Sequence, residues 1–226
     1  MRASKLCRLA IAGLLGIGMS AQAAAQGGFW GGEEHTPSLV VAPSSIQLDV
    51  PMPVSSGNLQ LMLAQATAGG GLAELKQQAV RGYTQYLHSE LARELYEYLN
   101  DEDIPLVDKD GVLNLQNSFD LKVIKHLNAM KPKDDYDLEQ GKVTLTGEFR
   151  YALTNRSGTP LREQLVSIDD LKVQEKYLVR TYHDGRASED NTEEAIKKAL
   201  SELVDELVES MEDNLDPDEL RAMAAM

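Results

Sequence analysis

The chain is poor in cysteine and in aromatic residues. Its one cysteine, Cys7, lies within the first 25 residues and ahead of an apolar run, so a chain that loses this segment has no thiol. Disulfides, thiolate catalysis and cysteine-ligated zinc or iron–sulfur sites are then excluded. Aromatic residues make up 5% of the sequence, which leaves the core mainly to leucine, valine, isoleucine, alanine and methionine.

Positive charge is also scarce. Lysine and arginine number 22 against 36 aspartates and glutamates, and the formal charge is −14. Removing the three positive charges of Arg2, Lys5 and Arg8 would change −14 to −17. Phosphate contacts require clustered lysine and arginine, so we expect no nucleic-acid partner. Anionic membrane surfaces should repel the chain, whereas cationic partners and divalent metals are favoured electrostatically.

Residues 1–25 have the three parts of a secretory signal peptide. A basic start is followed by the apolar run Leu9–Met19 and by small-x-small cleavage sites that end at Ala25. The run is shorter than the roughly 20 residues that a membrane-spanning helix needs. Cys7 precedes the run, whereas a lipoprotein cysteine follows it at the cleavage point. We therefore predict an exported, periplasmic protein that is not an integral membrane protein, with secretion as the alternative.

The rest of the chain is expected to form one folded domain, the body, with a flexible segment at each end. Residues 26–38 are glycine-rich and aperiodic, which predicts a flexible N-terminus. Its Phe29 and Trp30 either dock onto the body, which is the preferred interpretation, or contact a partner. Residues 39–213 should form a single α+β domain. Residues 214–226 should form a frayed tail.

Two long amphipathic helices are predicted in the body. Apolar residues recur at three- and four-residue steps along residues 72–99 and again along residues 192–213. A shorter helix is predicted at residues 59–67. The stripe of the C-terminal helix is nearly heptad-like, so it can pack on its own sheet or on a partner helix, and core packing is the default.

The strands follow from alternation of apolar and polar residues. Residues 39–54 read as extended, and Pro51 and Pro53 confine them to a sheet edge or an irregular end. Residues 119–127 favour a strand, between loops at 101–118 and 130–141. The stretches 143–153 and 161–182 should pair as a long antiparallel hairpin.

One-sided helices and a one-sided sheet each need a covering layer. Together they predict an α+β, two-layer domain, in which an antiparallel sheet with a long hairpin is covered by two long helices. The expected element order is β-α-β-β-β-α.

Motifs for catalysis or cofactor binding are missing. The sequence has no G-x-S-x-G, H-E-x-x-H, S-x-x-K or glycine-rich phosphate loop. The histidines are dispersed and are expected to be structural or surface residues: His35, His88, His126 and His183. We predict no catalytic residue and no cofactor, although clustered carboxylates leave a hydrolase open as an alternative.

One acidic segment bears comparison with a calcium-binding loop. Asp108, Asp110 and Gly111 match three positions of the EF-hand pattern, but Leu106 and Asn117 occupy the positions of its first and last acidic ligands. An ordinary Asp-Gly turn is therefore the preferred interpretation. The alternative is a calcium site built by four aspartates: Asp101, Asp103, Asp108 and Asp110.

Residues 142–213 resemble part of a known family. Tyr151, Leu153 and Gly158 have the spacing Y-x-L-x-x-x-x-G on a predicted hairpin, and a long acidic helix follows. This order is similar to that of small α+β auxiliary proteins of the Gram-negative envelope, such as the outer-membrane lipopolysaccharide-assembly lipoprotein. The chain differs from that family in its negative charge and in having no lipobox cysteine. The resemblance implies an assembly or auxiliary role without catalysis.

These patterns combine into one prediction of function. We expect a non-catalytic binding or assembly factor of the cell envelope that works through its sheet edge and its acidic C-terminal helix. Its partner should be another envelope protein, and a homodimer through the C-terminal helix is possible. The alternatives are a periplasmic hydrolase and a calcium-binding protein.

Overall fold

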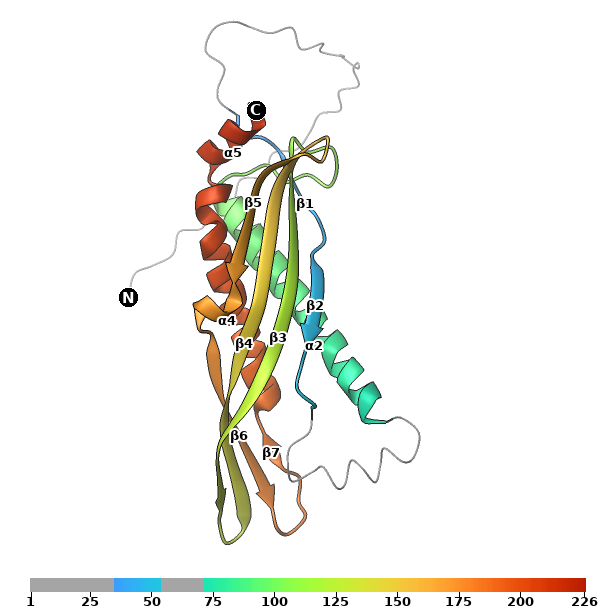
Figure 1. The fold of residues 1–226 in the computed structure, drawn as a ribbon, viewed down its shortest axis with the longest axis vertical. Helices are drawn as coiled ribbons and strands as arrows, with labels where there is room; N and C mark the ends of the chain where they lie inside the picture. Colours follow the sequence, from blue (N-terminus) through green and yellow to red (C-terminus); the bar gives the residue numbers. More distant parts are fainter. Residues whose placement is uncertain (1–34, 54–70) are drawn as a thin grey trace, which may run out of the picture. The chain divides into compact units, whose positions relative to one another are not determined.

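A long hairpin organises the sheet. In the computed structural model, β3 (Leu113–Pro132) and β4 (Tyr136–Asn155) pair antiparallel along almost their whole length, with one irregularity between Leu127 and Ala129 (Figure 1). The structure describes residues 35–53 and 71–226, all within one unit, residues 34–226. The predicted signal peptide, Phe29, Trp30 and the predicted helix at 59–67 lie outside the described residues.

Two short strands pair with the outer edge of β3, and both run parallel to it. They are β1 (Leu39–Val41) and β2 (Ser45–Asp49). Between β2 and β3 the chain passes through α2 (Leu72–Asp101), and a helical crossover of this kind joins parallel strands. The seven-stranded sheet is therefore mixed, and the prediction of an antiparallel sheet is wrong on this side.

The other edge of β4 is shared by two strands. β5 (Pro160–Ser167) pairs with its later half and β6 (Gln174–Tyr182) with its earlier half, and the short helix α3 (Ile168–Leu171) separates them. The predicted pairing of 143–153 with 161–182 is confirmed in this interrupted form. β7 (Glu189–Asp190) completes the sheet beside β6.

The predicted loops on either side of β3 are shorter than expected. Strand β3 starts at Leu113, and residues 130–141 belong to β3 and β4 apart from a turn at 133–135. Figure 1 shows this turn beyond the ends of α2 and α4. No helix of the described residues covers this end of the hairpin, so its sequence needs few apolar residues there. The polar sequence forms strands here through backbone pairing and through polar side-chain contacts such as that of Lys125 with Glu139.

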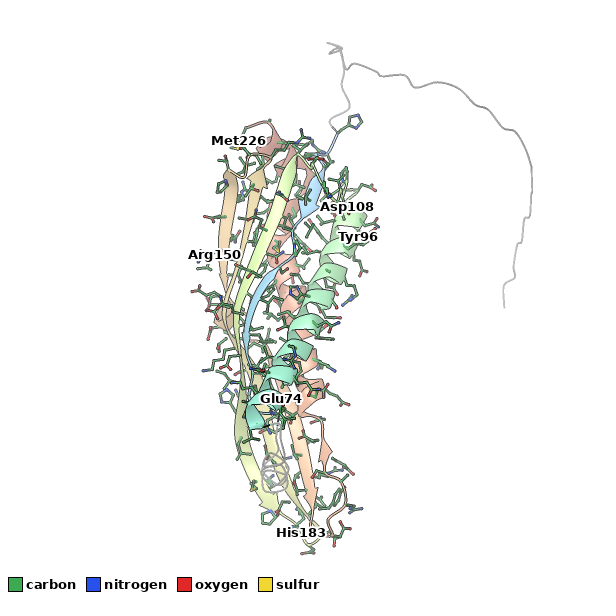
Figure 2. The ribbon with its side chains drawn as sticks, turned by 90° about the vertical axis from the view of Figure 1, so that its right-hand side faces the viewer. Glu74, Tyr96, Asp108, Arg150, His183 and Met226 are labelled. Carbon is green, nitrogen blue, oxygen red and sulfur yellow. The ribbon has the colours of Figure 1, made fainter. Side chains whose placement is uncertain are left out.

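One face of the sheet is covered by α2 and by α4 (Thr192–Leu215), which contact each other. Figure 2 shows this second layer, with Tyr96 of α2 on the helix side and Arg150 on the open face of the sheet. The α+β class is confirmed, as is the predicted stripe of α2. Its buried residues are Tyr83, Leu87, Leu91, Leu95 and Leu99.

The C-terminal segment is more ordered than predicted. Residues of the expected frayed tail form α5 (Pro217–Ala224), on which Leu220 and Met223 are buried. The Asp216 side chain accepts a hydrogen bond of 2.7 Å from the Asp218 N–H, and Pro217 suits the first turn. A local capping signal and two apolar side chains thus continue the helix layer. Within residues 35–53 and 71–226, no helix is long and apolar enough to cross a membrane.

Candidate functional site

The four candidate calcium ligands lie at the end of α2 and in the loop before β3. Among the described residues, no three histidine, cysteine, aspartate or glutamate side chains are placed to hold a metal ion. The Arg156 guanidinium donates hydrogen bonds of 3.1 Å to the carbonyl oxygens of Asp110 and Gly111, so an arginine holds the backbone of this turn. Asp103 and Asp110 have positive φ angles of 54° and 59°, as expected in turns.

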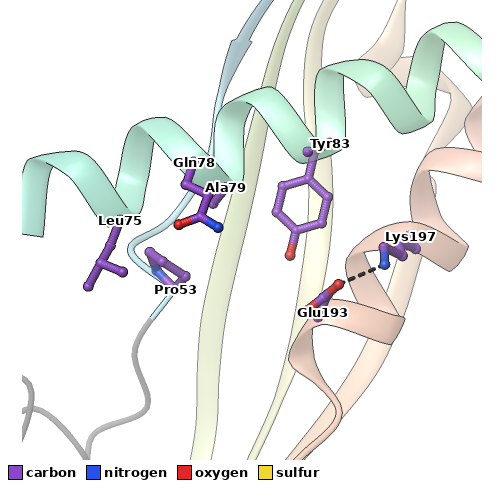
Figure 3. A pocket seen from close by; sticks show the side chains of 8 residues that line it. Pro53, Leu75, Gln78, Ala79, Tyr83, Glu193 and Lys197 are labelled. Carbon is purple, nitrogen blue, oxygen red and sulfur yellow. Dashed lines mark hydrogen bonds and ion pairs between the residues drawn. The ribbon is translucent and has the colours of Figure 1, made fainter.

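A cavity of about 380 Å³ lies between α2 and the start of α4 (Figure 3). Tyr83 points from α2 toward Glu193, and the Glu193 carboxylate accepts a 2.7 Å hydrogen bond from Lys197. Burial, helped by Glu193 and Asp190, raises the pKa of Tyr83 from 10.0 to about 12. Among the described residues of its lining, Glu193 is the one carboxylate, whereas glycoside hydrolysis uses a pair of acids.

The pKa of Tyr83 predicts a loss of stability at high pH. Because its folded pKa is raised, the neutral phenol stabilises the fold fully below pH 10.0, and this contribution is lost as the pH rises toward about 12. In urea unfolding between pH 8 and pH 12, the free energy of unfolding should fall less steeply with pH for Tyr83→Phe than for the wild type. Parallel declines would show that Tyr83 ionises equally in both states.

A second cavity, of about 330 Å³, contains three carboxylates, from Glu189, Asp190 and Glu194. Glu189 accepts hydrogen bonds from Tyr182 (2.6 Å) and Arg180 (2.7 Å), and these donors lower its pKa. A general acid needs a raised pKa, so this cluster favours salt bridging over acid catalysis.

A larger groove, of about 670 Å³, lies between β1 and α2 and is mostly apolar. Figure 2 labels two of its lining residues, Tyr96 and Asp108. Asp108 is the one charged residue among the described residues that line it, whereas ligand sites combine an apolar wall with several convergent polar groups. The groove therefore gives no chemical indication of a ligand.

The sheet edge is a stronger candidate. Pairing on the outer side of β3 ends where Asp49 faces Lys122, and residues 123–132 have no partner strand there within the described part of the chain. Leu113 donates to the Ser38 carbonyl and Leu115 accepts from Ala42, so odd-numbered residues of β3 direct their backbone groups outward. Val123, Lys125 and Leu127 continue that alternation up to the bulge. We call residues 123–132 the β3 edge.

Two apolar side chains stand exposed on the β3 edge. Leu127 is 56% and Met130 51% exposed, and they pair with Gly141 and Glu139 of β4. Gly141 and Glu139 are buried, so their partners point toward the helix side of the sheet. Because the helices end short of this part of the hairpin, Leu127 and Met130 remain uncovered by them.

A cluster of polar side chains joins the β3 edge to the neighbouring strands β4 and β6. The Lys125 ammonium lies 2.9 Å from the Glu139 carboxylate and 4.4 Å from the centre of the Tyr177 ring. The Tyr177 hydroxyl donates to the same carboxylate at 3.0 Å, and burial raises the pKa of Tyr177. A β-carbon on Gly141 would lie 2.4 Å from the Tyr177 ring, so the ring packs directly on the glycine backbone. These contacts fix β3, β4 and β6 together.

The second predicted surface, the acidic C-terminal helix, is divided between two environments. The heptad-like stripe of α4 is buried in the domain, where it contacts α2, β4 and β6. It is therefore unavailable to a second copy, and the prediction of a homodimer through this stripe is not supported. The exposed face of α4 carries Glu202, Asp205, Glu206 and Glu209.

Neither a family model nor a curated protein matches the sequence. Among solved structures, the chain is similar to a Helicobacter pylori protein described as a homolog of a neuraminyllactose-binding hemagglutinin. The TM-score is 0.50 and the identity 10%, over 84% of this chain and 91% of that chain. A minor lipoprotein from Acinetobacter baumannii has a TM-score of 0.33 and 11% identity, over 81% and 93%. The first likeness shows a shared fold, and the second is too distant to support an argument.

Proposed function

We propose that this chain is a non-catalytic binding protein of the bacterial envelope that holds a partner protein by strand addition along the β3 edge. The observation that carries the proposal is the unpaired outer side of residues 123–132 in the described structure. The export signal predicted in residues 1–25 supports the location. Tyr182 and Arg180 lower the pKa of Glu189 in the acidic cavity, which favours a role other than acid catalysis for this carboxylate.

The chemistry of the β3 edge suits an extended peptide. Outward N–H and C=O groups of Val123, Lys125 and Leu127 would supply main-chain hydrogen bonds, which give affinity in strand addition. Leu127 and Met130 would contact alternate side chains of the added strand, which gives specificity. Lys131 and Lys133 are exposed beside them, so the partner segment should carry acidic residues.

Site-specific photo-crosslinking in a bacterial host that exports the chain tests this proposal. A photoreactive residue at Met130 should give one discrete crosslinked product. The same residue at Leu165 of β5, which is also 51% exposed, should give none. Leu127→Pro removes an outward N–H without removing one that faces β4. It should reduce crosslinking from Met130 about ten-fold, as expected for a loss of about 1.4 kcal/mol.

The controls separate loss of binding from loss of fold. Leu127→Pro should keep the melting temperature of the purified protein within a few degrees, because proline is tolerated on an edge strand. Equal crosslinking from Met130 and Leu165, or a Met130 product that persists in folded Leu127→Pro, would contradict strand addition. The absence of any product from Met130 would also count against it.

A further inference from the structure

We propose that the open face of the sheet, around His126, Lys142 and Lys176, binds a small hydroxylated ligand that bears a carboxylate or phosphate group. We call these residues the basic row. This inference goes beyond the partner-binding role of the β3 edge. Leu127 and Met130 point to the helix side, whereas the basic row is on the opposite face, which carries Arg150 in Figure 2.

The register of three strands creates the basic row. His126 of β3 pairs with Lys142 of β4, and Lys142 pairs with Lys176 of β6. Like charges placed directly opposite each other on one face destabilise a sheet. The chain has 36 acidic residues, yet none stands in this row. An arrangement that opposes folding and concentrates positive charge is typical of a functional site.

The described part of the chain does not neutralise these lysines. No carboxylate lies within 4.0 Å of the Lys142 or Lys176 ammonium group among the described ion pairs. Lys142 donates to the neutral Gln174 side chain at 3.2 Å, and His126 is 2.8 Å from the Thr144 hydroxyl. Glu175, next to Lys176 in sequence, points to the other face and pairs with Lys198.

A cavity at the basic row has the size and lining for a small polar ligand. Its volume is about 480 Å³, within the range of small-molecule sites. Besides Lys142 and Lys176, its lining includes three residues with amide side chains, Asn128, Gln140 and Gln174. Glu175 also belongs to the lining, and its carboxylate is paired with Lys198. Two ammonium groups suit an anionic oxygen group, and amides can both donate to and accept from hydroxyls. Leu178, which is also in the lining, offers an apolar contact for a ring.

The test is a titration of the whole mature chain, residues 26–226, with glucuronic acid, glucose 6-phosphate and glucose, followed by amide NMR shifts. At least one anionic sugar should bind with a Kd of about 1 mM or tighter and shift the amides of residues 140–144 and 174–178. Glucuronic acid alone would identify a carboxylate site and glucose 6-phosphate alone a phosphate site. Binding of both would show that the site recognises the negative charge that the carboxylate and the phosphate have in common. Glucose should bind at least ten-fold more weakly than the anionic sugar.

Matched variants decide whether the basic row is responsible. Lys142→Gln and Lys176→Gln should each weaken binding about ten-fold, whereas Lys122→Gln, on the same face but outside the row, should leave it unchanged. No binding by either anion, equal binding of glucose, or equal effects of all three variants would overturn the proposal. Crosslinking from Met130 should be unaffected by Lys176→Gln, so a failure of this site and a failure of the β3 edge are distinguishable.

Discussion

Replacing Gly147 by alanine should lower the free energy of unfolding by about 3–5 kcal/mol, one of the largest effects expected of a single methyl group in this chain. Gly147 has φ +129°, a region that other residues rarely adopt, and a β-carbon there would lie 2.0 Å from the Asp120 carbonyl oxygen. The backbone of β3 would have to move away from β4. In a domain of this size the melting temperature should fall by about 6–20 °C.

Gly82 supplies the matched control for that substitution. It lies in the middle of α2, and a β-carbon there would meet no atom within 4 Å. Alanine is the better helix former, so Gly82→Ala should raise the free energy of unfolding by about 0.5–1 kcal/mol. Urea denaturation followed by circular dichroism measures both variants. If Gly147→Ala were as stable as Gly82→Ala, the close approach of β3 and β4 at Gly147 would be wrong.

The sequence predicts the parts of the fold whose pattern is set by burial. Both long helices and the strand at 143–153 are confirmed because each has one face in the core, which imposes a period on its apolar residues. Residues 130–141 have no such period, since the helices do not cover that end of the hairpin. Their strand structure depends on pairing among β3, β4 and β6, which composition does not reveal. The parallel pairing of β2 depends likewise on the path of the chain through α2.

The candidate sites are harder to predict because they depend on register. The β3 edge is defined by where β2 stops pairing, and no residue of β3 signals that point. The basic row joins His126, Lys142 and Lys176, which are separated in sequence and come together only when three strands are aligned. One feature of the sequence indicates basic character near this row, because Lys122, Lys125 and His126 lie close together in a chain of negative net charge.

Replacing Leu207 by alanine should lower the free energy of unfolding by about 2–5 kcal/mol, because the cavity left in the core closes only in part. Leu207 is 0% exposed and lies on the heptad-like stripe of α4. Its neighbour Glu206 is exposed, so Glu206→Ala should change stability by no more than about 0.5 kcal/mol. Thermal and urea unfolding of the two variants measure the difference.

The same pair of variants separates two roles for the stripe of α4. If the stripe belongs to the core of one chain, Leu207→Ala destabilises the protein while light scattering gives the same molar mass as for the wild type. If the stripe instead joined two copies, the variant would shift the molar mass and make the melting temperature depend on protein concentration. Burial of Leu207 within a single chain leads us to expect the first result. A mass change in Leu207→Ala alone would restore the helix to the candidate interfaces, and the β3 edge would then share partner binding with it.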